Sequence, residues 1–171
     1  YDQAGRKRNK ASLRAEWSPA DSLDAGADYG LLRDDFETEY GLLNSRTEYF
    51  AVDASLNPFE AWTLYADYTW ELMTSRTRSR YRTSTVDTEN NDWLGLLEDK
   101  SHTVSVGTNY ALLEDKLDAG ADWSMTYSKG IQLASNPNAI TTASALATDL
   151  PNTYTRLNKV RANLRYRWTK S

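Results

Sequence analysis

Much of the fold follows from the octapeptide LDAGADYG, Leu23–Gly30, which the chain contains twice. The second copy, Leu117–Ser124, reads LDAGADWS and differs only in having Trp for Tyr and Ser for Gly. Within each copy, apolar residues alternate with acids, glycines or serine at every position. A side-chain period of two is typical of a β-strand whose two faces meet different environments. The repeat therefore predicts two strands that are built in the same way.

The chemistry of the two faces indicates a membrane barrel. One face carries the acids and glycines, and the other carries Leu and Ala and ends in an aromatic ring. In an outer-membrane β-barrel, alternate residues meet lipid outside and a polar lumen inside, with aromatic rings at the interfaces. A soluble antiparallel sheet with one buried face also alternates, but its core face would favour Val, Ile and Leu. We therefore expect an all-β, transmembrane, antiparallel up-and-down β-barrel, with a soluble β-sandwich as an alternative.

The composition agrees with a barrel and excludes several other classes. The 171 residues include 11 Tyr and 6 Trp but only 3 Phe and 2 Met, and the mean hydropathy is -0.70. No apolar run approaches the ~20 residues that a transmembrane helix needs. The net charge of -4, with acids and bases interleaved, is not the signature of a nucleic-acid-binding protein. The absence of Cys removes disulfides, thiolate catalysis and Cys-type metal sites from this segment.

The two ends of the sequence predict a piece of a larger barrel. The chain begins at Tyr1 without an initiator Met or a signal peptide, although an outer-membrane protein must be exported. It ends at Ser171 without the terminal aromatic residue that is common on the closing strand of bacterial barrels. We expect residues 1–171 to form part of a single barrel domain, as a fragment of about seven strands.

Seven alternating segments are the predicted strands. The clearest, Trp62–Leu72, matches the ~9–11 residues that a tilted strand needs to cross a bilayer. Where the alternation lapses, we expect long external loops. The predicted strands are about residues 10–18, 23–31, 50–56, 62–72, 102–112, 117–127 and 159–168, and the predicted loops are about residues 32–46, 74–100 and 130–153.

The lengths of the connections predict an orientation. Tight turns such as Pro19–Asp21 follow the first, third and fifth strands, whereas long loops follow the second, fourth and sixth. Outer-membrane barrels have short periplasmic turns and long external loops, so we expect the odd strands to descend in the bacterial outer membrane. Aromatic residues at the strand ends predict two girdles, with Trp17, Trp62 and Trp168 at the turn ends and Tyr29, Trp70 and Tyr127 at the loop ends.

The inward-facing positions are the candidate partner-binding surface. Glycines recur on this face, and glycine in a strand lets another backbone come close. The inward charges are also sorted by strand, because acids dominate the middle strands and arginines the last one. Ion pairing between neighbouring strands or contact with lumen water explains these charges equally well, and an open porin would present the same chemistry. The candidate lumen residues are Asp24, Gly26, Asp28, Asp53, Asp67, Gly107, Asp118, Gly120, Asp122, Arg161 and Arg165.

Four arginines beyond Trp70 are a candidate lipopolysaccharide site. Arg76, Arg78, Arg80 and Arg82 keep the outward parity of the preceding strand. If that strand continues past the membrane, their guanidiniums form a stripe at the level of lipopolysaccharide phosphates, for which Arg is well suited. A solvated loop whose arginines prevent edge-to-edge pairing is the simpler alternative, and a docking patch for an external acidic cytochrome is another.

Nothing in the sequence indicates catalysis. The lone His102 lies on the outward face at the start of a strand, where an interfacial role is expected rather than a general base or haem ligand. There is neither a Ser-His-Asp spacing nor a glycine-rich phosphate loop. Loop acids such as Asp87 and Asp92 lack the spacing of an EF-hand. We expect no catalytic residue, no metal site and no cofactor bound by this chain.

Two phrases of the sequence resemble a known family. The runs NNDWLGLLEDKSHTVSVGTNYALL, residues 90–113, and LDAGADWSMTYS, residues 117–128, are similar to segments of the MtrB/PioB-type outer-membrane barrels. The most specific part is the stretch from Asn91, Asp92 and Trp93 to Glu98 and Asp99. The family's amino-terminal Cys motif has no counterpart here.

The resemblance implies a non-catalytic sheath for electron transfer. Barrels of that family surround a periplasmic multihaem (decahaem) cytochrome and bring it within reach of an external cytochrome or acceptor, so haem is expected in the partner. Outer-membrane lipid and lipopolysaccharide are the other expected contacts, and nucleic acid is not expected. A general diffusion porin for small solutes is the main alternative, and a soluble β-sandwich adhesion module is a third.

Overall fold

The computed structural model describes residues 5–82, 87–113, 116–138 and 149–168. Among these residues the helical structure is limited to a 3-10 turn, η1, at Glu89–Asn91. No helix in the described ranges is both long and apolar enough to cross a membrane. The predicted turn at 114–115 and the parts of the predicted loops at 83–86 and 139–148 lie outside the described residues.

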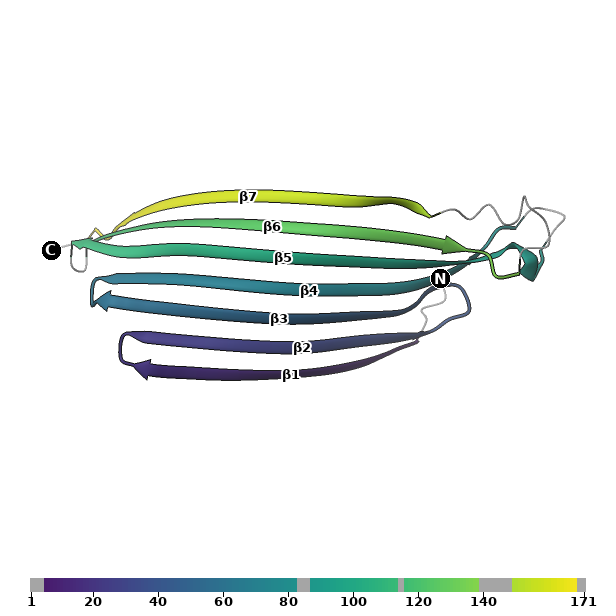
Figure 1. Ribbon diagram of the computed structural model, residues 1–171, viewed down its shortest axis with the longest axis horizontal. Coiled ribbons are helices and arrows are strands. Elements are labelled where there is room, and N and C mark those ends of the chain that lie inside the picture. The colour runs from purple at the N-terminus through teal and green to yellow at the C-terminus, as the bar shows by residue number, and fades with distance from the viewer. Residues whose placement is uncertain (1–4, 83–86, 114–115, 139–148, 169–171) are drawn as a thin grey trace.

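In the described residues seven long strands follow one another, and each is antiparallel to the next (Figure 1). Their order in the sheet is their order in the sequence, which is the up-and-down topology expected of an outer-membrane barrel. The predicted fold class is confirmed. The strands are β1 (Gly5–Ala20), β2 (Leu23–Glu37), β3 (Gly41–Phe59), β4 (Trp62–Arg80), β5 (Asp92–Leu113), β6 (Leu117–Ser135) and β7 (Leu150–Tyr166).

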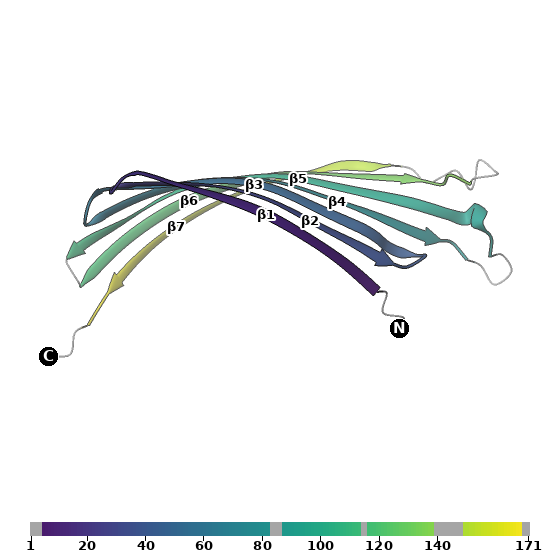
Figure 2. The same cartoon turned by 90° about the horizontal axis from the view of Figure 1, so that it is seen from below.

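The sheet is bent into an arch but is not closed (Figure 2). Within the described residues, β1 pairs only with β2 and β7 pairs only with β6. Every residue of these two edge strands is consequently exposed. An unpaired strand edge is a template for further pairing. The arrangement is thus consistent with one part of a barrel wall.

The described residues contain no buried apolar core. Large apolar side chains are instead exposed, including Leu13 at 74% and Val160 at 77%. A soluble β-sandwich buries one face of each sheet against the other, and the described part of the chain has only one sheet. The soluble-sandwich alternative is therefore wrong, and the apolar face needs a lipid environment.

An aromatic row crosses the apolar face near the loop ends of the strands. The backbone register places Tyr29 opposite Phe50, Phe50 opposite Trp70, Trp70 opposite His102 and His102 opposite Tyr127. This loop-side aromatic row contains the three residues predicted for the outer girdle. At the turn ends, Trp62 lies opposite Tyr110 and stacks on Phe59, with ring centroids 6.4 Å apart.

The spacing between the aromatic ends of β4 is close to the height of the apolar band of an outer-membrane barrel. From Trp62 to Trp70 the strand rises roughly 26 Å at ~3.3 Å per residue. A strand tilt of ~35–45° reduces this height to roughly 20 Å, somewhat below the ~25 Å apolar band of outer-membrane barrels. The aromatic ends of one strand thus mark its membrane-crossing segment.

The predicted loop boundaries were wrong, because the strands continue well past the membrane-crossing segments. Residues 32–46, predicted as a loop, contain the end of β2, the beginning of β3 and a connection of only Thr38–Tyr40. Likewise β4 continues to Arg80, β5 begins at Asp92, β6 continues to Ser135 and β7 begins at Leu150. Strand β1 also begins earlier than predicted, so the basic residues Arg6, Lys7 and Arg8 belong to it.

The alternation lapses before the strands end for a physical reason. Apolar alternation is required only where one face meets lipid, whereas a strand that projects into water can carry polar residues on both faces. Its continuity depends on the backbone ladder, which continues in register from Leu31–Glu48 to Asp35–Asn44 between β2 and β3. The loss of pattern therefore marks the edge of the membrane and not the end of the strand.

Candidate functional site

The predicted lumen residues all lie on one face of the sheet, which we call the polar face. Directly opposed residues of neighbouring strands share a face, as do residues two apart along a strand. Asp53 of β3 lies directly opposite Gly26 of β2 and Asp67 of β4. In the same way, Asp122 of β6 lies directly opposite Gly107 of β5 and Arg161 of β7. In an outer-membrane barrel the polar face lines the lumen, so contact of these residues with a partner stays a prediction.

Ion pairs tie the outer strands of the sheet together on the polar face. Arg161 of β7 lies 3.4 Å from Asp122 of β6, and Arg167 lies 2.8 Å from Asp118. Arg165 is directly opposite Asp118 in the register, yet the ion pair of Asp118 is with Arg167. These contacts indicate that the acids of β6 pair with arginines of the neighbouring strand. Such pairing was one of the alternatives to partner binding that the sequence left open.

The middle of the polar face carries an unbalanced acidic strip, made of Asp28, Asp53, Asp67 and Glu71. Asp53 and Asp67 are directly opposed on β3 and β4, an arrangement of like charges that destabilises a sheet. Arg14 of β1 reaches across β2 to Asp53, at 3.3 Å, over the bare backbone of Gly26. Among the described residues no cation pairs with Asp67 or Glu71. Negative charge is therefore concentrated on β3 and β4.

The inward glycines have a different role from the one predicted. A Cβ added to Gly30 would overlap the ring of Tyr49, and one added to Gly107 would overlap the ring of Tyr65. Each glycine is thus covered by a tyrosine that comes from the neighbouring strand and lies across the backbone. The space above these glycines is filled by the chain itself, and they are no evidence for the close approach of another protein.

A polar hollow lies near the turn ends of the polar face. It has a volume of about 440 Å³ and lies between the ends of β4, β5, β6 and β7. Gly120 belongs to this region, and the amide oxygens of Asn109 and Asn163 occupy the position that its Cβ would take. The charged residues of the lining are Glu60, Asp118, Arg165 and Arg167. The hollow has the polar lining of a water-filled or protein-contacting surface and no apolar pocket for a cofactor.

Arginines of the predicted lipopolysaccharide stripe are mostly engaged by acids. Strand β4 does continue past the membrane, but Arg78 and Arg80 each lie 2.5 Å from the carboxylate of Asp92 on β5. Arg82, which lies beyond the strand, and Arg80 pair with Asp87 at 3.4 and 3.1 Å. Of the predicted stripe, only Arg76 has no acidic partner among the described residues. The prediction of a stripe of four available guanidiniums is therefore wrong.

We call Arg78, Arg80, Asp92 and Tyr40 the arginine clasp. The guanidinium carbons of Arg78 and Arg80 lie 5.4 and 5.1 Å from the centre of the Tyr40 ring, within the range of cation–π contacts. The clasp joins the connection after β2 to the tips of β4 and β5. Sequence reasoning missed it, because only the extension of both strands brings Asp92 opposite Arg80.

The clasp carboxylate is the most buried acid among the described residues, since Asp92 is only 2% exposed. Hydrogen bonds from Arg80, together with those from Arg78, lower the pKa of Asp92 to about 2. Reciprocally, the hydrogen bond to Asp92 raises the pKa of Arg80 above its ordinary value. The carboxylate therefore stays ionised over the whole physiological range and is committed to the clasp.

His102 and the loop acids do not form a chemical site in the described structure. The Nδ1 atom of His102 lies 2.9 Å from the hydroxyl of Tyr68, so the ring is held at the apolar face by its neighbour on β4. The described residues contain no group of His, Cys, Asp or Glu side chains that could hold a metal ion. Asp92, considered for calcium, is occupied by arginines.

Comparison with known proteins identifies a family across the whole chain. A family model described as outer membrane beta-barrel porin, MtrB/PioB, matches residues 1–171. No curated protein matches the chain at a significant level. The family match agrees with the resemblance noted in the sequence and with the single antiparallel sheet.

Proposed function

This chain belongs to the MtrB/PioB family of outer membrane β-barrel porins, and we propose that it forms part of a barrel that encloses a periplasmic multihaem cytochrome. The barrel lies in the bacterial outer membrane, as the family description states. In this proposal the protein itself does no redox chemistry. It insulates the haem chain of its partner from lipid and positions it for electron transfer across the membrane.

The observation that carries the proposal is the acidic strip on the polar face. Asp53 has an ion pair with Arg14, but among the described residues neither Asp67, which lies opposite Asp53, nor Glu71 on the same face has a cationic partner. Such uncompensated charge costs stability in the isolated wall. A partner with basic residues at that level would relieve the repulsion, and complementary charge would also set its register inside the barrel.

The family description as a porin favours diffusion of small solutes as the second candidate. The polar hollow near the turn ends, at about 440 Å³, is wide enough for water and has charged residues at its edge. In an open barrel, water and counter-ions would screen the acidic strip. The two functions differ in whether the lumen contains protein.

Haem content and conductance of the full-length barrel test the proposal. The barrel is isolated in mild detergent from its native membrane, and the haem absorbance per barrel is measured together with ion conductance in planar bilayers. We expect haem to co-purify and the intact complex to conduct poorly, because a filled lumen leaves little continuous water. A haem-free barrel with large, steady conductance would establish the diffusion porin instead.

A charge variant links this result to the acidic strip. Replacing Asp53→Asn and Asp67→Asn removes two charges from the strip and should weaken haem retention, most visibly when the ionic strength is raised. Asp21→Asn with Glu37→Gln removes two charges outside the polar strip and serves as the matched control. Equal haem retention in both variants would show that the strip has no part in holding the partner.

A further inference from the structure

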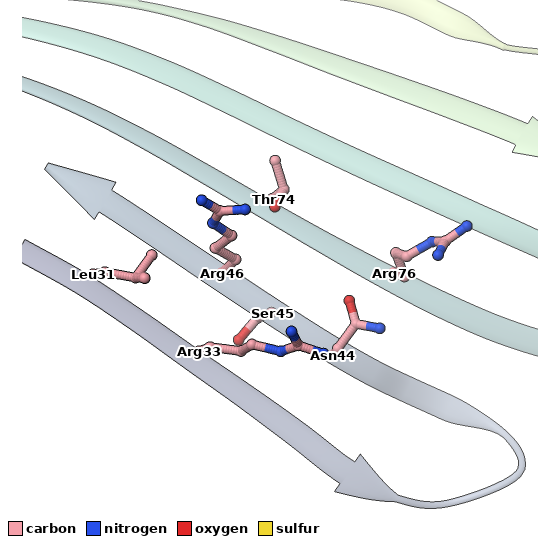
Figure 3. Close-up of a pocket in the computed structure, with 7 residues that line it drawn as sticks. All are labelled: Leu31, Arg33, Asn44, Ser45, Arg46, Thr74 and Arg76. Carbon is pink, nitrogen blue, oxygen red and sulfur yellow. The ribbon is translucent and has the colours of Figure 1, made fainter. Parts of the chain in front are cut away.

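Three arginines from three neighbouring strands line a hollow on the sheet (Figure 3). Along the strands the hollow lies past the loop-side aromatic row. Arg33 comes from β2, Arg46 from β3 and Arg76 from β4, and the volume of the hollow is about 360 Å³. The uncharged residues that line it are Leu31, Asn44, Ser45 and Thr74. We call this hollow the arginine pocket.

The pocket belongs to the apolar, lipid-facing side of the sheet. Arg33 lies directly opposite Arg46, and Arg46 lies directly opposite Thr74. Along each strand these residues keep the parity of the aromatic row, to which Phe50 and Trp70 belong. The guanidiniums therefore emerge from the outer surface of the barrel and not into its lumen.

Its height above the membrane core follows from the strand geometry. Arg33 and Arg46 are each four residues past the aromatic residue of their own strand, Tyr29 and Phe50. At ~3.3 Å per residue this is roughly 13 Å along the strand, or roughly 10 Å along the membrane normal at a tilt of ~35–45°. Headgroup layers add ~5–8 Å on each side of the hydrocarbon core. Long Arg side chains at this height reach the phosphate groups of the leaflet.

The charge balance of the pocket favours an anion. Arg33 is paired with Asp35 at 3.0 Å, and Arg46 is paired with Glu48. Each of these ion pairs joins two residues of the same strand. The guanidiniums of Arg33 and Arg46 therefore still face each other from neighbouring strands, where like charges repel. Arg76 is exposed and has no acidic partner among the described residues. The residues that line the hollow include three arginines and no acid.

The arginine clasp provides the contrast that singles out this pocket. Both sites contain arginines of β4 on the same face of the sheet. In the clasp, Asp92 takes hydrogen bonds from Arg78 and Arg80 and is itself nearly inaccessible. Among the residues that the structure describes, no acid bridges the three guanidiniums of the arginine pocket. The clasp thus contains its own bridging carboxylate, whereas the arginine pocket can take an anion from outside the chain.

We propose that Arg33, Arg46 and Arg76 bind a phosphate group of outer-leaflet lipopolysaccharide on the outer wall of the barrel. Guanidinium groups match the oxygens of a phosphate in bidentate geometry. Asn44 and Thr74 add neutral hydrogen-bond donors in the lining. The acyl chains of the same lipid would lie along the apolar face below, past Leu31 and the aromatic row.

Lipopolysaccharide retention by the full-length barrel tests the proposal. The variant Arg33→Gln, Arg46→Gln, Arg76→Gln is compared with Arg6→Gln, Lys10→Gln, Lys159→Gln, which loses the same charge from the polar face. Lipopolysaccharide per purified barrel is measured by native mass spectrometry. We expect the first variant to lose bound lipopolysaccharide and the second to retain it. Equal retention in the two variants would overturn the proposal.

A single substitution keeps the test valid if the triple variant fails to assemble. Arg76→Gln breaks no ion pair in the described structure, and we expect roughly tenfold weaker binding, as for the loss of one charged hydrogen bond. Arg76→Lys keeps the charge but not the bidentate geometry, so its affinity should lie between those of the parent barrel and of Arg76→Gln. Unchanged affinity in Arg76→Gln would contradict the assignment of Arg76.

Competing ligands identify the source of the phosphate. Delipidated barrel is titrated with lipid A that carries its phosphates, with dephosphorylated lipid A, with phosphatidylglycerol vesicles and with inorganic phosphate. The proposal expects tight binding of the phosphorylated lipid A alone. Equal binding of dephosphorylated lipid A or of phosphatidylglycerol would overturn it, and so would binding of inorganic phosphate as tight as that of the lipid.

Discussion

The membrane-crossing and projecting parts of the same strands obey different rules. In β4, the segment from Trp62 to Trp70 alternates apolar and polar residues, whereas the segment from Thr74 to Arg80 is polar on both faces. Both segments belong to one continuous ladder with β5, without a break in register from Trp62 to Arg80 (Figure 1). The difference teaches that the surrounding solvent selects the side chains, while the backbone hydrogen bonds maintain the strand.

The two regions also differ in how neighbouring strands are joined by side chains. In the crossing region, tyrosines lie across glycines on the polar face, and aromatic residues meet on the other. In the projecting region, charged pairs dominate, such as Arg8 with Asp34 at 2.7 Å and Arg80 with Asp92 at 2.5 Å. We therefore expect steric fit to determine stability in the membrane-crossing region, and ion pairs to determine it in the projecting region.

An arginine on the lipid face should have the largest effect, and only within the crossing segment. Ala66 lies midway between Trp62 and Trp70 on the apolar face of β4, so Ala66→Arg should lower the unfolding free energy by ~2–4 kcal/mol. Thr74→Arg, on the same face but beyond Trp70, should cost ~0–1 kcal/mol. Denaturant unfolding of the full-length barrel in lipid vesicles measures both. Similar costs at the two positions would contradict the boundary placed at Trp70.

Cysteine labelling checks the faces on which that comparison depends. A lipid-soluble thiol reagent should modify Ala66→Cys, and a water-soluble reagent that enters the lumen should modify Asp67→Cys. Residues 1–171 contain no native Cys, so any label within this segment reports the introduced position. The opposite pattern would mean that the two faces have been exchanged.

Substitution of a glycine should lower the unfolding free energy by less than an arginine on the lipid face does. The effect should again be larger in the membrane-crossing region than in the projecting region. Gly107→Ala places a methyl group in the ring of Tyr65, and displacement of the ring should cost ~1–3 kcal/mol, as for other overpacked sites. Gly95→Ala meets the hydroxyl of Thr77 at 2.6 Å in the projecting region, where a small side chain can rotate away. Unfolding free energies of the two variants are compared. The double variant with Tyr65→Ala should recover part of the Gly107→Ala cost, and failure to do so would exclude the clash as its cause.

Loss of the arginine clasp should have the smallest global effect and a clear local one. Asp92→Asn removes the charge that Arg78 and Arg80 share, so we expect the β4–β5 tip to loosen while the membrane-crossing sheet remains intact. The mobility of a spin label at Ser79→Cys reports the tip, and heat-resistant migration of the folded barrel reports the rest. Asp87→Asn is the comparison, because Asp87 is exposed, reaches the clasp only through Arg80 and has Arg82 as its other partner.

The clasp should also open in acid. Hydrogen bonds from Arg80 and Arg78 lower the pKa of Asp92 from its ordinary value of 3.8 to about 2. The folded state therefore holds fewer protons, and the stabilisation is complete above about pH 4 and is lost as the pH falls towards 2. Spin-label mobility at position 79 should rise in that range in the parent barrel, whereas the Asp92→Asn variant should be mobile throughout. A transition near neutral pH would contradict the assignment to Asp92.

Sequence periodicity was sufficient to predict the strands, the two faces and the three residues of the loop-side aromatic row. Alternation in segments such as Leu23–Gly30 has only one regular structure that satisfies it, because a period of two does not fit a helix. The Asp and Gly positions assigned to the polar face share that face in the structure. The strand ends were not predictable in the same way, because beyond the membrane neither face imposes an apolar pattern.

Side-chain partners are set by the register between strands, which no single segment encodes. Tyr49 covers Gly30, and Asp92 captures Arg78 and Arg80, because hairpin connections bring residues of different strands to the same height. The same register leaves Arg76 apart from the clasp and beside Arg33 and Arg46. The sequence alone determined which side of the wall each residue faces, since the direction of a side chain follows from its own strand. The tertiary structure decided which charges are neutralised and which stay available, because that depends on residues brought together from separate strands.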